Sequence, residues 1–206
     1  TYSMHGEDLV LEKYFKEIDN GFYVDLGCYH PIQYNNTILL YQKGWRGINI
    51  DINEFSIKLF NFCRPDDLNL NLAVSDKNGE IDFYYQKKLS LLSTIKKSQT
   101  NFAFQGKINK KKILCQTLTK VLDDSKYKDK QIDFLDIDVE GADLDVLKSL
   151  DFFRYSPKLI CVEILPENMD FQNINIEKSD ICNFLKIKNY KKIWSGLFNH
   201  IFVKNL

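Results

Sequence analysis

The sequence has no excess of charge of either sign, because 28 Lys and Arg residues balance 28 Asp and Glu residues over 206 positions. This balance argues against a broad nucleic-acid-binding surface. The sequence also contains no apolar run long enough to span a bilayer and no secretory signal pattern, so the cytoplasm is the expected compartment. No repeat, low-complexity tract or linker divides the chain, and its length predicts a single domain over residues 1–206. Nothing in the sequence indicates an oligomeric state.

Cysteine pairs with metal-binding spacing are also missing. Five cysteines are scattered along the chain without a C-x-x-C pair, and Cys115 and Cys161 lie inside apolar runs. This pattern favours buried free thiols over disulfides or zinc ligands. We expect no metal centre.

A glycine-rich dinucleotide loop is the third missing feature. Residues 22–27 are expected to form a buried strand that runs into a tight turn. Asp25 and Gly27 stand at its end, where an α/β sheet presents its ligand-binding edge. Tyr29 and Ile32 occupy the positions at which G-x-G-x-x-G requires further glycines, which counts against a pyrophosphate site. An acid beside one close-approach glycine suits a ligand with an ammonium group and a ribose; an ordinary strand and turn is the alternative.

Further strands are expected to end in polar residues at the same edge of a doubly wound α/β sheet. A strand at 48–51 ends in Asp51, which is placed to bind both hydroxyls of a ribose, although a simple polar strand end is the alternative. A strand at 68–74 leads into Ser75 and Asp76. The other expected elements are a helix within residues 1–20, helices at 38–43, 54–62, 118–122 and 177–187, and strands at 81–85, 113–116 and 158–164.

Three acids follow the strand expected over residues 132–136. Asp136, Asp138 and Glu140 stand at alternate positions, ahead of a helix that begins near residue 141. Such carboxylates can hold an ammonium group, accept a proton from a hydroxyl or ligate a hard cation. The structural alternative is that the positive end of the helix dipole stabilises nearby acids. This would account for the presence of Glu140 and also of Asp138. It does not explain Asp136 inside an apolar run, which we therefore interpret as functional.

Residues 87–112 are rich in lysine and carry Phe102 and Phe104 among polar residues. A long span of this kind indicates an insertion that forms a mobile cover over a site, and a solvated loop is the alternative. At the end of the chain, residues 190–194 and 200–204 flank a glycine-containing turn. This arrangement predicts a terminal hairpin.

In their order and spacing, these motifs resemble the FkbM-type S-adenosylmethionine-dependent methyltransferases. The resemblance covers nearly all of the chain. It implies the Rossmann-like class I methyltransferase fold, with a doubly wound seven-stranded sheet and a C-terminal antiparallel hairpin. The stretches that carry it are Ser3 to Asp8, Val24 to Gly27, Asn36-Thr37, Gly44 to Gly47, Arg64-Pro65, Ala73 to Ser75, Asp136 to Gly141 and Val162-Glu163.

The resemblance also implies S-adenosyl-L-methionine as the cofactor and gives roles to residues at the strand ends. Tyr29 stands where many class I enzymes have a small residue. The contacts expected on this basis are Asp25, Gly27, Tyr29 and Thr37 near the methionine end, Asp51 at the ribose, Ser75 with Asp76 near the adenine, and Asp136 at the amino group or sulfonium.

The reaction that the resemblance implies is methylation of a hydroxyl on a sugar or sugar-containing small molecule, such as a nucleotide-activated sugar or a surface glycan. A sugar hydroxyl is a poor nucleophile, so a base should remove its proton. Asp138 and His30 are the candidates, because both follow strand ends at the same edge. A helix cap and a histidine packed before Pro31 are the corresponding structural alternatives.

Two other functions stay open at this point. One is a nicotinamide-dependent oxidoreductase, against which the missing glycines count. The other is a non-catalytic nucleotide-binding domain that keeps the fold. Binding of S-adenosylmethionine or of NAD would separate the first from methyl transfer, and turnover would separate the second.

Overall fold

A seven-stranded sheet forms the centre of the protein in the computed structural model, which describes residues 1–87, 93–97, 100, 106–165 and 176–205. The strand order is β3-β2-β1-β7-β8-β10-β9. β10 is antiparallel to both of its neighbours, whereas the pairs among β3, β2, β1, β7 and β8 are parallel. The predicted sheet and its C-terminal hairpin are therefore confirmed. The strands are β1 Phe22–Leu26, β2 Arg46–Asp51, β3 Leu68–Asn71, β7 Phe134–Ile137, β8 Leu159–Glu163, β9 Tyr190–Ser195 and β10 Asn199–Lys204.

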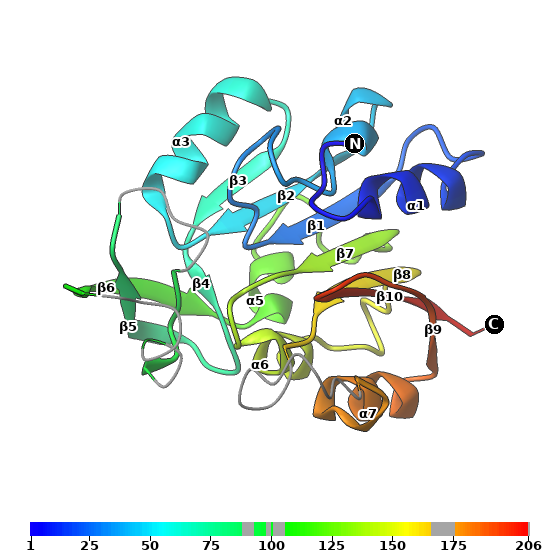
Figure 1. Ribbon diagram of the computed structural model, residues 1–206. Coiled ribbons are helices and arrows are strands. Elements are labelled where there is room, and N and C mark those ends of the chain that lie inside the picture. Colours follow the sequence, from blue (N-terminus) through cyan, green and yellow to red (C-terminus); the bar gives the residue numbers. More distant parts are fainter. Residues whose placement is uncertain (88–92, 98–99, 101–105, 166–175, 206) are drawn as a thin grey trace.

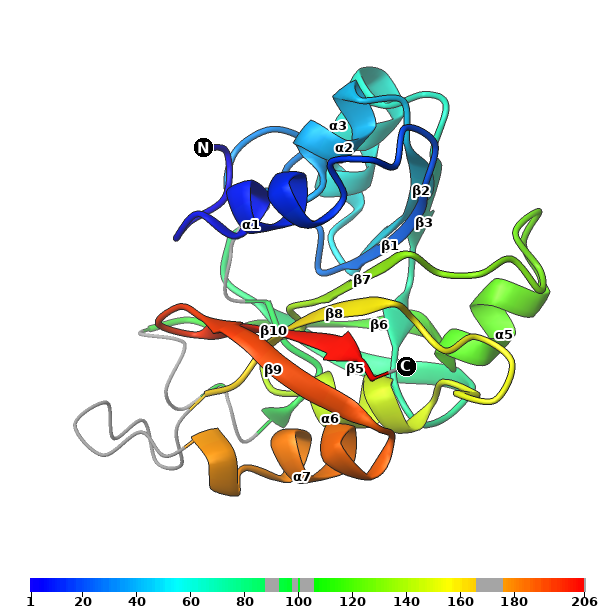
Figure 2. The ribbon, with the colours of Figure 1, turned by 90° about the vertical axis from the view of Figure 1, so that its right-hand side faces the viewer.

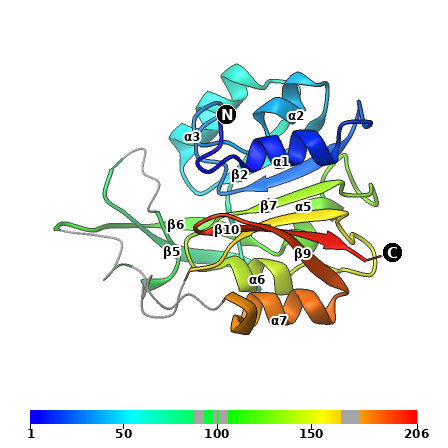
Figure 3. The same ribbon diagram turned by 45° about the vertical axis from the view of Figure 1, so that its right-hand side comes forward.

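Helices cover both faces of this sheet (Figures 1 and 3). The first group lies on one face and contains α1 Glu7–Tyr14, α2 Ile38–Gln42 and α3 Glu54–Cys63. The second group lies on the opposite face and contains α5 Leu118–Asp123, α6 Asp143–Lys148 and α7 Asp180–Ile187. Figure 2 shows the two layers from a direction at right angles to Figure 1. None of the described helices is long and apolar enough to cross a lipid bilayer.

The central strand β1 is buried along its whole length and contributes side chains to two separate cores. Alternate side chains of a strand point to opposite faces of the sheet. Val24 and Leu26 therefore join the larger core with Val146 of α6. Tyr23 joins the smaller core with Leu11 of α1. The near-continuous apolar run of this strand follows from its position in the middle of a parallel sheet.

A second sheet of three strands, in the order β4-β6-β5, stands at the side toward which β1 and β2 point (Figure 1). Its strands are β4 Ala73–Val74, β5 Gly79–Tyr85 and β6 Asn109–Gln116. The single strand predicted over residues 68–74 is therefore wrong, because its two ends belong to different sheets. β2 ends at Asp51, whose carbonyl accepts a hydrogen bond from the side chain of Asn71 (2.9 Å). Residues 73–74 have no further β2 backbone beside them and pair with β6 instead.

The strand predicted at 113–116 is longer than expected, because β6 begins at Asn109. Its lysines face outward and meet acids of β5: Lys110 pairs with Asp82 (2.7 Å) and Lys112 with Glu80 (3.6 Å). Residues 109–112 are thus a paired strand and not a part of a mobile cover. Within the rest of the predicted cover, residues 88–92, 98–99 and 101–105 lie outside the described residues.

Two predicted helices are shorter than expected. α1 occupies Glu7–Tyr14 of the first 20 residues. The helix predicted at 177–187 is a 3₁₀ turn, Ile176–Lys178, followed by α7. Ser179 separates the two, because its side chain caps α7 by accepting a hydrogen bond from the Cys182 N–H at 3.1 Å. Such a cap fixes the start of a helix more sharply than apolar spacing does.

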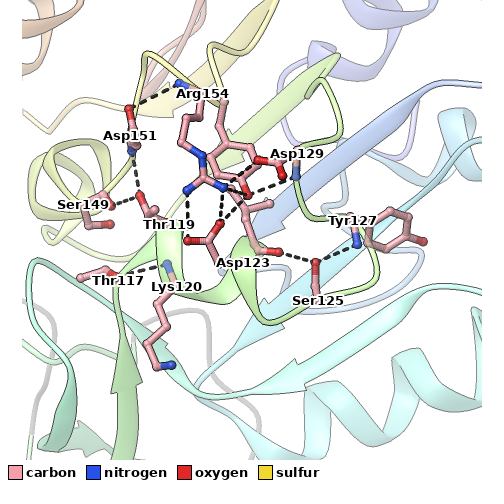
Figure 4. A network of polar contacts seen from close by, with 12 residues as sticks. Thr117, Thr119, Lys120, Asp123, Ser125, Tyr127, Asp129, Ser149, Asp151 and Arg154 are labelled. Carbon is pink, nitrogen blue, oxygen red and sulfur yellow. Dashed lines mark hydrogen bonds and ion pairs between the residues drawn. The ribbon is translucent and has the colours of Figure 1, made fainter.

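A charged network fixes the loops at the amino ends of β7 and β8 (Figure 4). Arg154, which precedes β8, donates to Asp123 of α5 and to Asp129, which precedes β7, both at 2.7 Å. The Tyr155 hydroxyl donates to the same Asp123 carboxylate at 2.6 Å. The hydrogen bonds from Arg154 are the main reason that the pKa of Asp123 is lowered. Carboxylates at this end of the sheet are therefore compensated by a cation of the protein itself.

We expect Phe134→Ala to lower the free energy of unfolding by about 3–5 kcal/mol, because it leaves a cavity in a packed core. Phe134 is 0% exposed in the smaller core, whereas Phe153 is 98% exposed. The matched variant Phe153→Ala should change stability by less than about 0.5 kcal/mol. Urea denaturation of both variants measures the difference. Equal losses would contradict the assignment of Phe134 to the core.

Candidate functional site

On the sheet face that carries the smaller core, the side chains become polar toward the carboxyl ends of three neighbouring strands. The parallel register places Asp25 of β1 opposite Asp136 of β7, and Asp136 opposite Cys161 of β8. Two residues earlier on the same face, Tyr23 and Phe134 are core residues. Carboxyl ends of parallel strands are where α/β proteins bind ligands. The change from apolar to acidic residues along this face marks the start of the candidate site.

Asp25 is held in a buried network that involves the loop after β1. Its Oδ2 accepts hydrogen bonds from the Thr37 hydroxyl (2.8 Å) and from the Asn35 side chain (3.2 Å). Arg64, which follows α3, donates to the same Thr37 hydroxyl at 2.8 Å and to Asn35 Oδ1 at 2.6 Å. Burial raises the pKa of Asp25, while Thr37 and the charge of Arg64 act in the opposite direction. Thr37, predicted as a cofactor contact, lies beside Asp25 and fixes the loop; its contact with a cofactor stays a prediction.

Asp136 is buried beside Asp25 and has one amide partner. The Asn36 side chain donates to its Oδ2 at 2.9 Å. Burial raises the pKa of Asp136 well above its ordinary value, and the neighbouring charge of Asp25 adds to this effect. In the sequence Asn36 stood out only as part of the Asn36-Thr37 motif and was not linked to Asp136. This contact spans 100 positions in the chain, so local spacing gives no signal for it.

Gly27 lies where the loops after β1 and β7 come closest. Its φ is +76°, and a Cβ at this position would lie 1.7 Å from the carbonyl oxygen of Asp138. The Asp138 N–H donates to the Leu26 carbonyl at 3.0 Å, which holds the two loops together. A side chain at position 27 would therefore clash with protein backbone as well as demand an unfavourable conformation. The predicted approach of Gly27 to the cofactor stays a prediction.

Asp51 connects the end of β2 to the loop after β1. Its Oδ2 accepts the Tyr29 N–H at 2.9 Å, and its Oδ1 accepts the Asn53 N–H at 2.6 Å. Ser56 of α3 donates to the Tyr29 carbonyl at 2.5 Å. Burial raises the pKa of Asp51 to about 6 despite these hydrogen bonds. Tyr29 therefore enters the candidate site through its backbone.

Non-glycine residues with left-handed backbone conformations occur in both loops, including Tyr34 with a φ of 51°. Tyr29 has a φ of 51° in the loop after β1, and Glu140 has a φ of 52° in the loop after β7. Such conformations cost energy and are concentrated at functional sites. Both loops are held in place by the contacts with β2 and β1 described above.

Four carboxyl groups, which we call the acidic group, gather around the loop after β7: Asp138, Glu140, Asp143 and Glu163. Burial raises the pKa of Asp138 to about 7, that of Asp143 to about 6 and that of Glu140 to about 9. Burial also raises the pKa of Glu163 to about 11. Negative charges within the group reinforce the shifts of Asp138, Glu140 and Glu163. Asp143 has a structural use, because it accepts the N–H groups of Val139 and Gly141 at 3.1 Å.

The acidic group is not arranged as a metal site. Across the described parts of the chain, no set of three or more His, Cys, Asp or Glu side chains is placed to hold a metal ion. Buried carboxyl groups repel one another and favour the protonated state or a nearby positive charge. A positively charged ligand would therefore be stabilised at this edge of the sheet.

His30 lies in the outer turn after β1 and is partly buried. Its Nδ1 accepts the N–H groups of Ile32 (3.2 Å) and Gln33 (3.1 Å). Burial lowers the pKa of His30, and the charge of Arg64 lowers it further. With Nδ1 accepting, the neutral ring carries its proton on Nε2, which is then a donor and not a base. The geometry favours Asp138 over His30 as a proton acceptor, and both catalytic roles stay predictions.

Ser75 and Asp76 lie at the joint between the two sheets. The Ser75 N–H donates to the Gln116 carbonyl at 3.2 Å, and its hydroxyl donates to Asp76 at 3.3 Å. Both residues line a cavity of about 600 Å³, together with Tyr84 of β5 and Asp145 of α6. An adenine contact at Ser75 stays a prediction, and Ser75 itself is buried.

The described part of the predicted cover joins this cavity to the loop after β7. Thr94 pairs with Tyr84 of β5 through two backbone hydrogen bonds. Its hydroxyl donates to the Glu140 carbonyl at 2.9 Å. Lys96 forms an ion pair with Asp145 at the start of α6. Residues 93–97 thus bridge the second sheet and the acidic group.

Comparison with models of protein families identifies the family to which the chain belongs. The model of the methyltransferase FkbM domain matches residues 25–192. The chain belongs to the FkbM methyltransferase family. The match includes Asp25, Asp51, Asp136 and Asp138, so the FkbM domain contains the whole row of strand-end acids.

Solved structures agree with this assignment at the level of the fold. A TehB-like SAM-dependent methyltransferase from Corynebacterium glutamicum superposes with a TM-score of 0.50 at 9% identity, over 98% of this chain and 89% of that protein. A protein from Sulfolobus solfataricus assigned as a type 11 methyltransferase gives a TM-score of 0.48 at 11% identity, over 99% and 95% of the two chains. No curated protein sequence matches the chain. The fold is that of the class I S-adenosylmethionine-dependent methyltransferases.

The residues of the FkbM site fit S-adenosylmethionine. This cofactor carries an ammonium group and a sulfonium group, and the acids at the ends of β1 and β7 are buried with raised pKa values. A cation placed among them would be stabilised electrostatically. Asp51 provides a carboxylate at the end of β2, the position that binds ribose hydroxyls in doubly wound folds.

We expect Asp138→Asn to stabilise the ligand-free FkbM protein increasingly as the pH rises from about 4 to about 7. The pKa of Asp138 is raised from 3.8 to about 7 on folding, so the folded wild type binds the proton more tightly and loses stability across this window. Above pH 7 the gain should level off at roughly 1–4 kcal/mol.

Urea denaturation at pH 5 and pH 8 measures this gain. The control is Asp19→Asn, because the Asp19 side chain is 83% exposed and should show no such trend. A variant that gains less stability at pH 8 than at pH 5 would show that Asp138 is not held in a carboxylate-rich, buried setting.

Proposed function

We propose that this FkbM-family protein transfers a methyl group from S-adenosylmethionine to a hydroxyl of a sugar or sugar-containing small molecule, such as a nucleotide-activated sugar or a surface glycan. The observation that carries the proposal is the position and pKa of Asp138. Its backbone touches Gly27 at the cofactor edge, and its carboxyl group titrates near pH 7. A base with a pKa near the working pH is the most effective in proton transfer. The zero net charge of the chain supports a small-molecule acceptor over a nucleic acid.

We assign a contact with the cofactor to each residue according to its position at a strand end. Asp51 would hold the ribose hydroxyls, and Asp136 with Asp25 would face the amino group and the sulfonium. Ser75 and Asp76 would lie beside the adenine, at the cavity that they line together with residues of β5 and α6. Gly27 and the Tyr29 backbone would line the methionine moiety.

The chemistry then needs positioning and one proton acceptor. Bound S-adenosylmethionine supplies an electrophilic methyl group, whose bond to sulfur breaks with the electron pair staying on sulfur as the acceptor oxygen bonds to carbon. Asp138 would orient the acceptor hydroxyl and take its proton. Orientation of the two reacting groups supplies much of the acceleration in reactions of this type. Arg64, Asn35 and Thr37 would keep the loop after β1 in the required position through Asp25.

The described segment around Thr94 supports the predicted cover. It contacts Glu140, in the loop that carries Asp138, and Asp145 of α6, as a cover of this site would. Closure of a segment over an active site excludes water from the reacting groups. We propose that residues 93–97 form the inner edge of this cover.

The family assignment favours methyl transfer over a nicotinamide-dependent reaction. A screen of nucleotide-activated sugars and glycans with labelled S-adenosylmethionine, analysed by mass spectrometry, tests the acceptor class. Binding of the cofactor without turnover on any acceptor would favour a non-catalytic nucleotide-binding domain.

Asp51→Asn should weaken binding of S-adenosylmethionine roughly 10–100-fold, the effect of losing a charged hydrogen bond of about 1–3 kcal/mol. Asparagine keeps an oxygen for the Tyr29 N–H but turns its NH2 group toward the Asn53 N–H, so thermal unfolding of the variant is measured alongside to check that the loop stays in place. Isothermal titration calorimetry measures the affinity, with Asp19→Asn as the control. Unchanged affinity would remove Asp51 from the ribose site.

Asp138→Asn should lower kcat by roughly 100-fold or more while the Kd of the cofactor changes little, because a general base contributes on this scale. In the wild type, kcat/KM should rise with pH through an apparent pKa of about 7, the value for Asp138 in the ligand-free protein, and the pKa seen in kcat should be lower because the bound cofactor is positively charged. Steady-state kinetics on an acceptor from the screen measures both effects. Activity that EDTA abolishes and magnesium or manganese restores would contradict this role and make the carboxylates metal ligands.

A further inference from the structure

Glu163 is a buried carboxyl group at the end of β8 that the mechanism above does not use. It is 8% exposed, and no described residue forms a hydrogen bond with its Oε2. Ile137 and Val162 are paired in the parallel register, so Asp138 and Glu163 are the next residues on the two strands. Glu163 therefore ends its strand beside the proposed base.

The surroundings of Glu163 hold it in the uncharged form. Burial is the main influence on its pKa, and the negative charges of Asp138, Asp143 and Glu140 act in the same direction. A protonated carboxyl group has one O–H donor as well as acceptor oxygens. A buried polar atom without a partner costs free energy, so such a group is expected to meet a partner when the site is filled.

Polar side chains also lie next to Glu163 on the side of β10. The antiparallel register places Asn199 of β10 directly opposite it. Asn199 donates from its side chain to Glu7 at 3.0 Å, and Glu7 also accepts the His5 N–H at 2.8 Å. The charge of Glu7 reaches Asp138, whose pKa it raises. The N-terminal segment and three strand ends thus bring hydrogen-bonding groups to one corner of the sheet.

We propose that Glu163 is an acceptor-binding residue, whose carboxyl O–H donates a hydrogen bond to the hydroxyl next to the one that Asp138 deprotonates. This inference rests on the proposed function and specifies its acceptor: an uncharged pair of neighbouring hydroxyls, as sugars carry. An anionic group of the acceptor would be repelled at this corner by the acidic group, so any phosphate of the acceptor must lie away from it.

The first test combines enzyme variants with a change in the acceptor. Glu163→Gln keeps a donor of similar size, whereas Glu163→Leu removes it; Glu12→Gln, an exposed site, is the control. The acceptors are one that the wild type methylates and its deoxy analogue without the neighbouring hydroxyl. Glu163→Leu should lower kcat/KM roughly 10–100-fold on the diol and have little effect on the deoxy analogue. Glu163→Gln should stay close to wild type, and the Kd of S-adenosylmethionine should be unchanged in all variants.

Two kinetic outcomes would overturn the inference. If Glu163→Gln is as impaired as Glu163→Leu, the negative charge is required and the residue is not a neutral donor. If Glu163→Leu loses equally on both acceptors, or on neither, Glu163 does not bind the neighbouring hydroxyl.

Infrared spectroscopy provides a test that does not depend on an identified acceptor. At pH 8 the wild-type spectrum minus that of Glu163→Gln should contain the carbonyl stretch of a protonated carboxylic acid, and the wild-type spectrum minus that of Glu12→Gln should lack it. The difference spectrum is needed because burial raises the pKa of Glu140 to about 9, so that Glu140 also absorbs as an acid at this pH. With S-adenosylhomocysteine bound, glycerol serves as a minimal polyol probe and should shift the band. Absence of the band, or no response to glycerol, overturns the inference even if the wild type methylates sugars. A shifted band in a protein that methylates none of the screened acceptors supports Glu163 and places the failure with the proposed acceptor class.

Discussion

The close approach of the loops after β1 and β7 determines how the rest of the site is arranged. Gly27 allows the backbone of Asp138 to come within a distance that no side chain at position 27 would permit. The parallel register sets the acids at the ends of β1 and β7 side by side, and this close approach keeps the two loops together beyond the strands. The loop after β1 is also fixed to Asp136 through Asn36 and to Asp51 through the Tyr29 N–H.

The two ends of the sheet differ in how they treat negative charge. At the amino ends, Arg154 compensates Asp123 and Asp129 with direct hydrogen bonds. At the carboxyl ends, burial and mutual repulsion raise the pKa values of the acidic group. The first arrangement stabilises loops, and the second is the pattern of perturbed pKa values that is concentrated at functional sites. The two ends of the same strands thus differ in whether their acids are neutralised by the protein itself.

Strand ends were predictable from the sequence because burial makes parallel strands apolar and leaves their terminal acids conspicuous. Asp25, Asp51 and Asp136 were found in this way. The network of Arg64 with Asn35 and Thr37 was not, because it joins residues separated by about thirty positions and leaves no periodic signal. Glu163 was recorded only as part of a motif, since its importance depends on β10 inserting between β8 and β9 and bringing Asn199 opposite it. The split of residues 68–74 between two sheets was missed because it depends on where the neighbouring strand β2 ends, and the sequence of residues 68–74 does not contain this information.

The uncompensated acids also bear on how this protein would evolve in the laboratory. Each of them costs folding free energy in the absence of ligand, so exchanging one for a neutral residue removes that cost. A selection for thermal stability alone would therefore accumulate substitutions at the carboxyl edge and progressively remove the proposed active site, a trade-off common in enzymes. Substitutions that stabilise the amino edge around Arg154 would avoid this conflict, and that region offers the safer starting point for engineering.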